Sequence, residues 1–317
     1  EPINTMGNFS ISNIMIKKAF DGNGDDTFST FKSNRTIIAN RLAQKAGLNS
    51  TDGFGEMSQQ GLLPAFLAAY SGKDASKIAL NTCRSTPIPN WKISYRGLMN
   101  LKWFKDNFSS FTLSNAYRAS YGILGFNNNL QYDASNPYGN SNKNKANDFN
   151  SELLINGVNL IEDFSPLIQV DLKLINSLSF KAEINRDKSL NLNFNNNSLT
   201  EIRGKEYVIG VGYRFKDLQL RIKNGSSNTI YKGDLNLKAD FSIRDNLTVI
   251  RAIDKENNQI TGGQKLVAFK FLADYNLSKN LMASFFYDQN TPRFAISTTF
   301  PRKSNSTGLS IRYTLGN

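Results

Sequence analysis

Apolar and polar residues alternate at every second position through most of the chain after residue 150. The clearest runs are 168–174, 178–184, 235–243 and 267–275, where aliphatic and aromatic side chains share one parity and charged or amide side chains share the other. This period of two predicts β-strands that each have one apolar and one polar face. We therefore expect an all-β fold built as a meander of antiparallel strands.

The connections between the predicted strands differ in length. Short breaks alternate with longer ones rich in Asn, Gly, Ser and Lys: the short ones are 186–188, 216–217, 244–246 and 276–280, and the long ones are 199–204, 224–231, 254–263 and 288–306. A soluble sandwich buries its apolar faces and a membrane barrel turns them to lipid, so alternation alone does not separate the two. A strict alternation of short and long connections is typical of an outer-membrane barrel. One break does not fit: 175–177 is short, although it falls on the outer side, where the other connections are long.

The same pattern extends toward the N-terminus. Further strands are expected at 8–18, 91–98, 109–133 and 152–161, with an Asn-rich outer loop at 134–150. The expected organisation is a barrel strand in 1–18, a loop insertion in 19–90, and barrel strands through 91–317 that end in the terminal strand 307–316. The predicted fold class is thus an antiparallel transmembrane β-barrel segment of about 12–13 strands with a small helical insertion near the N-terminus.

Two short helices are expected within the insertion. Residues 29–46 have apolar side chains at helical spacing before Gly47, and the apolar stretch 60–71 ends at Gly72. Neither is long enough to span a membrane, so both are expected in the lumen or over a barrel mouth. The motif DGNGDD at 21–26 is expected to be a solvated turn, because it lacks the Gly and Glu that a calcium loop requires at its sixth and twelfth positions. A small amphipathic helix is expected at 98–108.

The parity of each strand assigns side chains to the two faces of the predicted barrel wall. The lipid-facing residues are predicted to be Ile168, Val170, Leu172, Phe180, Ile184, Leu235, Leu237, Phe241, Val267, Phe269 and Phe271. The lumen-facing residues are predicted to be Lys173, Lys181, Glu183, Arg214, Arg221 and Lys238. In the terminal strand, Leu309, Ile311, Tyr313 and Leu315 share one face. Aromatic residues near the strand ends fit an interfacial girdle, and equally fit the general preference of Tyr and Phe for strands.

The composition excludes most catalytic chemistry. The 317 residues include no His and one Cys, so a Ser-His-Asp triad, a His-containing zinc site and an internal disulfide are all ruled out. No GxxxxGK[ST] nucleotide loop is present. We therefore predict a protein that is not an enzyme, with no catalytic residue, metal or cofactor. With a mean hydropathy of −0.41 and no long apolar run, no transmembrane helix is expected.

The chain is basic, with 38 Lys+Arg against 26 Asp+Glu and a net charge of +12. The basic residues are spread one or two per strand, and no known nucleic-acid motif is present, so a nucleic-acid partner is not expected. The excess fits a lumen lining, contact with lipopolysaccharide phosphates, or no specific role.

Several stretches, taken in their order and spacing, carry a family resemblance. They include RTIIANRLA (35–43), LLPAFLAAYSGK (62–73), PIPNWKISYRGL (87–98), FTLSNAYRASY (111–121), FSPLIQVDLKLINSLSFKAE (164–183), LTEIRGKEYVIGVGYRFKD (199–217), DLNLKADFSIRDNLTVIR (234–251) and GLSIRYTL (308–315). In these stretches the chain resembles the C-terminal part of the SprA/Sov family, the giant outer-membrane translocon of the type 9 secretion (gliding-motility) system of Bacteroidota.

The resemblance implies a function and partners that the composition alone does not. It implies a wall segment of an outer-membrane channel that passes folded cargo proteins with a C-terminal secretion domain. The implied partners are a PorV-like outer-membrane barrel, a periplasmic plug protein, the remaining N-terminal part of the same translocon, and outer-membrane lipid. A start at Glu1-Pro2 with no signal peptide gives the expectation of a mature product or a piece of a longer chain. The alternative is a self-contained porin or receptor barrel; an outer-membrane hydrolase is the least favoured.

Overall fold

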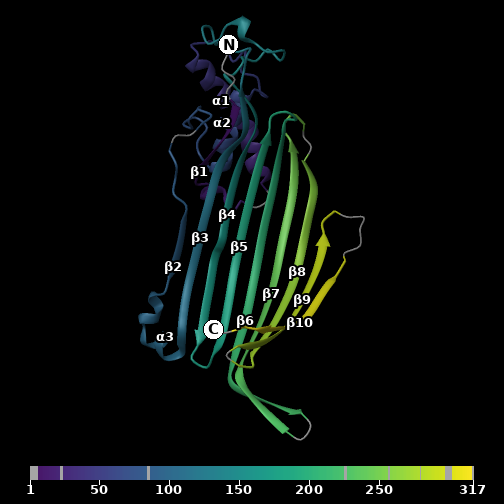
Figure 1. Cartoon of the computed structure of the whole chain (residues 1–317). Coiled ribbons are helices and arrows are strands. Elements are labelled where there is room, and N and C mark those ends of the chain that lie inside the picture. The colour runs from purple at the N-terminus through teal and green to yellow at the C-terminus, as the bar shows by residue number, and fades with distance from the viewer. Residues whose placement is uncertain are drawn as a thin grey trace.

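The protein forms one large antiparallel sheet with two helices packed at one end (Figure 1). This computed structural model describes residues 6–21, 24–83, 86–224, 227–255, 258–278, 280–296 and 302–315. The strands are β1 (Met6–Ser12), β2 (Trp91–Tyr95), β3 (Phe108–Asn128), β4 (Leu153–Leu174), β5 (Leu178–Asn193), β6 (Ser198–Asn224), β7 (Ser227–Ala252), β8 (Asn258–Asn276), β9 (Leu281–Phe294) and β10 (Ser304–Tyr313).

The strand order is β1-β3-β4-β5-β6-β7-β8-β9-β10, and β2 pairs with a second stretch of β3. Every pairing is antiparallel, so the predicted all-β meander with a small helical insertion is confirmed. The described sheet has ten strands, fewer than the expected number. Within the described residues no pairing joins β10 to β1 or β2, so the sheet is open at both edges.

The strand count is lower because several predicted turns lie inside strands. Residues 186–188 and 244–246 are in the middle of β5 and β7, where both stretches pair with residues 203–206 of β6. Arg244 forms an ion pair with Asp187 at 2.8 Å, so charged residues that resemble a turn in sequence satisfy one another across strands. Residues 216–217 form a bulge within β6, where Asp217 has a positive φ of 55°.

Most of the predicted long loops are also partly or wholly strand. Residues 199–204 belong to β6, and the predicted strands 152–161 and 168–174 are one strand, β4, with a register shift at Pro166. Proline lacks a backbone donor, which explains the break in the ladder there. The predicted outer loop 288–306 is shortened at both ends by β9 and β10, while 297–301 lie outside the described residues. The strict alternation of short and long connections was therefore wrong.

A weaker asymmetry between the two ends of the sheet remains. At the end away from the helices, β4 and β5 are joined through 175–177, and β8 and β9 through 277–280. At the helical end the connections are longer, up to the stretch 129–152 between β3 and β4. The β6–β7 hairpin projects beyond its neighbours at the end away from the helices (Figure 1).

The two predicted helices are present as α1 (Asp25–Lys45) and α2 (Gln59–Ser71). Asp25 and Asp26 favour the first turn of α1, the Ser58 side chain caps α2, and Gly72 ends it in the left-handed conformation. The third predicted helix is shorter, as α3 (Lys102–Asn107) after the 3₁₀ turn η2 (Gly97–Asn100); the other 3₁₀ turns are η1 (Ile16–Lys18) and η3 (Asn140–Asn142). No helix among the described residues is both long and apolar enough to cross a bilayer.

Candidate functional site: an uncovered apolar face

One face of the sheet is apolar from strand to strand. Residues that pair in an antiparallel ladder point to the same face, and neighbours along a strand point to opposite faces. By this register the apolar side chains form consecutive cross-strand rows, of which one is Ala182, Ile209, Phe241 and Phe269 and the next is Phe180, Val211, Ala239 and Phe271. We call this surface, from the row of Ile184 to the row of Phe215, the apolar band.

The register places every predicted lipid-facing residue on this face. Ile168 and Ile209 are 54% and 59% exposed, so nothing in the described chain covers the centre of the band. Leu309, Ile311 and Tyr313 of β10 share the same face and are more exposed still, at 63–70%. Leu315 follows β10 and is also exposed. Contact of these side chains with lipid stays a prediction.

The opposite face of the sheet is polar, and many of its charged side chains form ion pairs. Lys181 contacts Glu183 at 2.5 Å and Lys238 contacts Asp240 at 2.9 Å. The Arg214 guanidinium donates to Asp234, and Lys173 lies on this face at the end of β4. Arg221 lies in β6 opposite Ile230, and its side chain is outside the described part of the chain. The predicted lumen-facing side chains that are described therefore share one face.

The apolar band has a defined length along the strands and aromatic residues at both of its edges. Between Tyr207 and Phe215 it follows β6 for nine residues, and a tilted transmembrane strand needs about 9–11. Tyr207 lies at its edge near the helices, and Tyr213 and Phe215 lie at the other edge in edge-to-face contact. The girdle was expected at strand ends, but some aromatic residues, including Tyr207 of β6, lie well inside long strands.

The helices cover the continuation of this same face at one end, so they lie on the side of the sheet opposite the predicted lumen face. Phe31 of α1 and Phe66 and Tyr70 of α2 are fully buried, and so are Leu160 and Leu190 of the sheet below them. These side chains belong to one hydrophobic core. The apolar face is thus covered by the protein itself at the helical end and uncovered along the rest of the strands (Figure 1).

A cluster of charged side chains is buried where α1 meets the sheet. Glu201 is 0% exposed and accepts hydrogen bonds from Arg203 Nε at 2.7 Å and Arg251 Nε at 3.3 Å, with Lys188 Nζ at 3.8 Å. Arg251 also donates to Asp25 of α1 at 2.5 Å. The cluster joins β5, β6 and β7 to the start of α1. The sequence analysis did not predict this cluster. Its signal was that Lys188 and Glu201 stand at positions where the alternation puts apolar side chains.

A second buried polar group fastens the N-terminal segment to the sheet. The Tyr117 hydroxyl donates to Glu162 Oε1 and accepts from the Met15 backbone N–H, both at 2.8 Å. Burial is the main cause that raises the pKa of the Glu162 carboxyl, and the bond from Tyr117 opposes it. The pKa of Lys188 is lowered, again mainly by burial. Glu162 and Lys188 both lie in the part of the sheet beneath α1 and α2, outside the apolar band.

The raised pKa of Glu162 gives a pH dependence with a definite sign. Between the unfolded pKa and the higher folded pKa, the folded chain holds the proton that the unfolded chain has lost. This carboxyl therefore contributes stability at low pH that is lost as the pH rises. We expect Glu162→Gln to gain stability relative to the parent between pH 4 and 7, measured as hydrogen-exchange protection of α1 and α2. A difference that does not change over this range contradicts the assignment.

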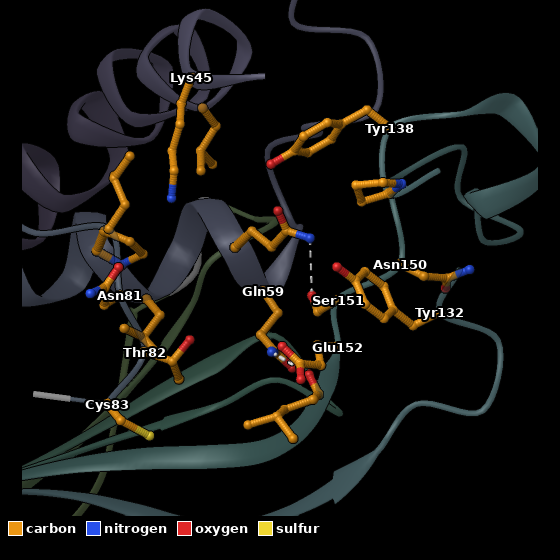
Figure 2. A pocket seen from close by; sticks show the side chains of 17 residues that line it. Lys45, Gln59, Asn81, Thr82, Cys83, Tyr132, Tyr138, Asn150, Ser151 and Glu152 are labelled. Carbon is orange, nitrogen blue, oxygen red and sulfur yellow. Dashed lines mark hydrogen bonds between the residues drawn. The ribbon is translucent and has the colours of Figure 1, made fainter. Parts of the chain in front are cut away.

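A cavity lined by both polar and apolar side chains lies beside the helices (Figure 2). It has a volume of about 420 Å³ and is bounded by α1, α2, the segment 80–83 and the connection between β3 and β4. Gln60 donates to the Ser151 hydroxyl at 3.2 Å, and Gln59 donates to the Leu153 backbone carbonyl at 2.9 Å. The side-chain oxygen Oε1 of Gln59 also accepts from the Ile155 backbone N–H at 2.8 Å, so the Gln59 side chain links α2 to β4.

The comparisons with known proteins assign no family to the chain. No family model matches it, and no curated protein matches it. The function is therefore argued from the sheet and its two faces.

Proposed function

We propose that this chain is a wall segment of a non-enzymatic, protein-conducting channel in the outer membrane of a Bacteroidota bacterium. The observation that supports this proposal most is the uncovered apolar band, together with the paired charges on the opposite face of the same sheet. In water such a band is unfavourable, because each exposed apolar Å² costs about 25 cal/mol. In a bilayer the same band is solvated by lipid while the polar face borders water.

The finer part of the proposal rests on the resemblance to the SprA/Sov family. In this proposal the channel passes folded cargo proteins of the type 9 secretion system, and the open sheet edges at β1, β2 and β10 pair with the rest of a larger barrel. A PorV-like barrel and a periplasmic plug protein are the proposed partners. Edge strands with unpaired backbone groups require a neighbour in lipid, which an incomplete barrel has to supply. The mixed charges of the polar face offer passing cargo few apolar contacts.

Single-cysteine labelling in cells tests both the membrane wall and the width of the channel. In a Cys83→Ser background, Phe241→Cys lies on the apolar band, and its neighbour Ser242→Cys lies on the polar face. We expect Ser242→Cys to react with a small and with a bulky polymer-linked maleimide, because a channel for folded proteins is wide. Phe241→Cys is expected to react only after detergent extraction.

Each other outcome has a defined meaning. Equal labelling of both positions before extraction contradicts a membrane wall. If Ser242→Cys reacts with the small reagent and excludes the bulky one, the lumen is narrow, and the self-contained porin or receptor replaces the translocon.

A further inference from the structure

A row of basic side chains crosses five strands at the edge of the apolar band nearest the helices. The paired residues of this row are Arg186 of β5, Lys205 of β6, Asp245 of β7, Lys265 of β8 and Arg293 of β9. Strands lie about 4.8 Å apart, so the row is roughly 19 Å long. Four of its five members are cations, and all lie on the face that carries the band.

The row lies at the boundary between apolar and polar surface. On one side the adjoining row is Ile184, Tyr207, Ile243 and Val267, which begins the apolar band. At the other edge of the band, the row of Phe215, Leu235, Tyr275 and Ala283 carries no charge, and neither does the pair Leu218 and Gly233 beyond it. The charge is therefore placed at one edge only, where a bilayer that covered the band would present its head groups.

A concavity extends the row toward the helices. A cavity of about 300 Å³ is lined by Arg186 and Lys205 of the row, by Lys188 and Arg203, which pair with Glu201, and by Asp21, Asp187 and Asp245. The Arg186 guanidinium lies 4.9 Å from the centre of the Phe20 ring, which fixes its position at the cavity edge. Planar guanidinium groups bind phosphate oxygens through two parallel hydrogen bonds, and ammonium groups add point charges.

The carboxylates around this cavity are mostly neutralised by other partners. Asp21 pairs with Lys18 at 3.0 Å, and Asp187 pairs with Arg244 at 2.8 Å. Asp245 is the one acid in the row itself. Lys205 and Lys265 are exposed, and neither comes within ion-pair distance of a carboxylate among the described residues. The row, with four cations and one acid, therefore presents net positive charge to solvent.

We propose that this basic row binds the phosphate groups of membrane lipids whose acyl chains lie along the apolar band. The proposal rests on the proposed function, since it requires the band to be in a bilayer. A lipid fits both parts of the surface, whereas a free phosphate ion fits only the row. Each lysine at a membrane surface contributes about fivefold in affinity for anionic lipid.

The test uses the full-length protein purified in neutral detergent from its own membranes. Its binding is measured to lipid A, the phosphorylated anchor of lipopolysaccharide, to dephosphorylated lipid A, and to inorganic phosphate. We expect preference for phosphorylated lipid A, and roughly 30-fold weaker binding for the double variant K205Q/K265Q. The charge-preserving variant K205R/K265R is expected to keep the affinity.

A matched control removes the same charge from the other face. Lys173 and Lys270 are exposed on the polar face, so K173Q/K270Q is expected to bind lipid A within about twofold of the parent. Equal binding of dephosphorylated lipid A, equal loss in both double variants, or inorganic phosphate binding as tightly as lipid A overturns the proposal. Retention in membranes after an alkaline carbonate wash is measured separately. If the parent is washed off, the proposed function fails; if it is retained without phosphate preference, only the lipid site fails.

Discussion

Replacing Glu201 by alanine is expected to lower the stability of the helical end by about 3–5 kcal/mol. This carboxylate is fully buried and balances Arg203, Arg251 and Lys188. Removing it leaves buried cations without their counter-charge, and cations in a low-dielectric interior are costly. The effect is expected to be local to α1, α2 and the strand ends beneath them.

Hydrogen exchange of α1 and α2 in the intact protein measures this loss. Glu206→Ala is the matched control on the same strand: Glu206 lies on the polar face, is partly exposed, and is 3.7 Å from Arg244. A change of at most about 1 kcal/mol is expected there. If Glu201→Ala leaves the protection of both helices at the parent level, the cluster does not hold them to the sheet.

Placing a lysine at Ile209 is expected to cost about 2–4 kcal/mol in membrane insertion. Ile209 lies in the central rows of the apolar band and is 59% exposed, so little packing within the protein is lost. The penalty therefore comes from a charge in lipid. We expect markedly less of the variant in the outer membrane, with the rest degraded or found in the periplasm.

The neighbouring position provides the control. Val208 is directly adjacent on β6 and faces the polar side, opposite Glu183. Val208→Lys adds the same charge to a face that already pairs charges, so a near-parental amount in the membrane is expected. If the two lysines reduce insertion equally, the band does not face lipid.

The alternation of the sequence was sufficient to predict the two faces of the sheet. Phe241 and Lys181 were assigned to opposite faces correctly, because each strand is exposed differently on its two sides and selection of side chains follows that difference. Strand length was harder. The charges of 186–188 and 244–246 are typical of turns, and only their cross-strand partners make them strand residues.

The features that depend on distant pairing could not be predicted. Glu201 and Arg251 belong to neighbouring strands, and the second partner of Arg251, Asp25, lies near the start of the chain. The basic row likewise exists only once the register is known, since its members are spread between residues 186 and 293. In the sequence these cations look evenly distributed, while in the sheet they form a line.

The bond between Asp25 and Arg251 also bears on the order in which the protein assembles. These residues are 226 positions apart, whereas from β3 to β10 each strand pairs with the next strand in the chain. Contacts between near neighbours in sequence form with the smaller loss of chain entropy. The helices pack on side chains of β3, β4 and β5, whereas the ion pair of α1 with Arg251 forms only once β7 is in place. The contact of Asp25 with Arg251 therefore closes the helical end of the sheet late, after strand pairs that lie near one another in the sequence have formed.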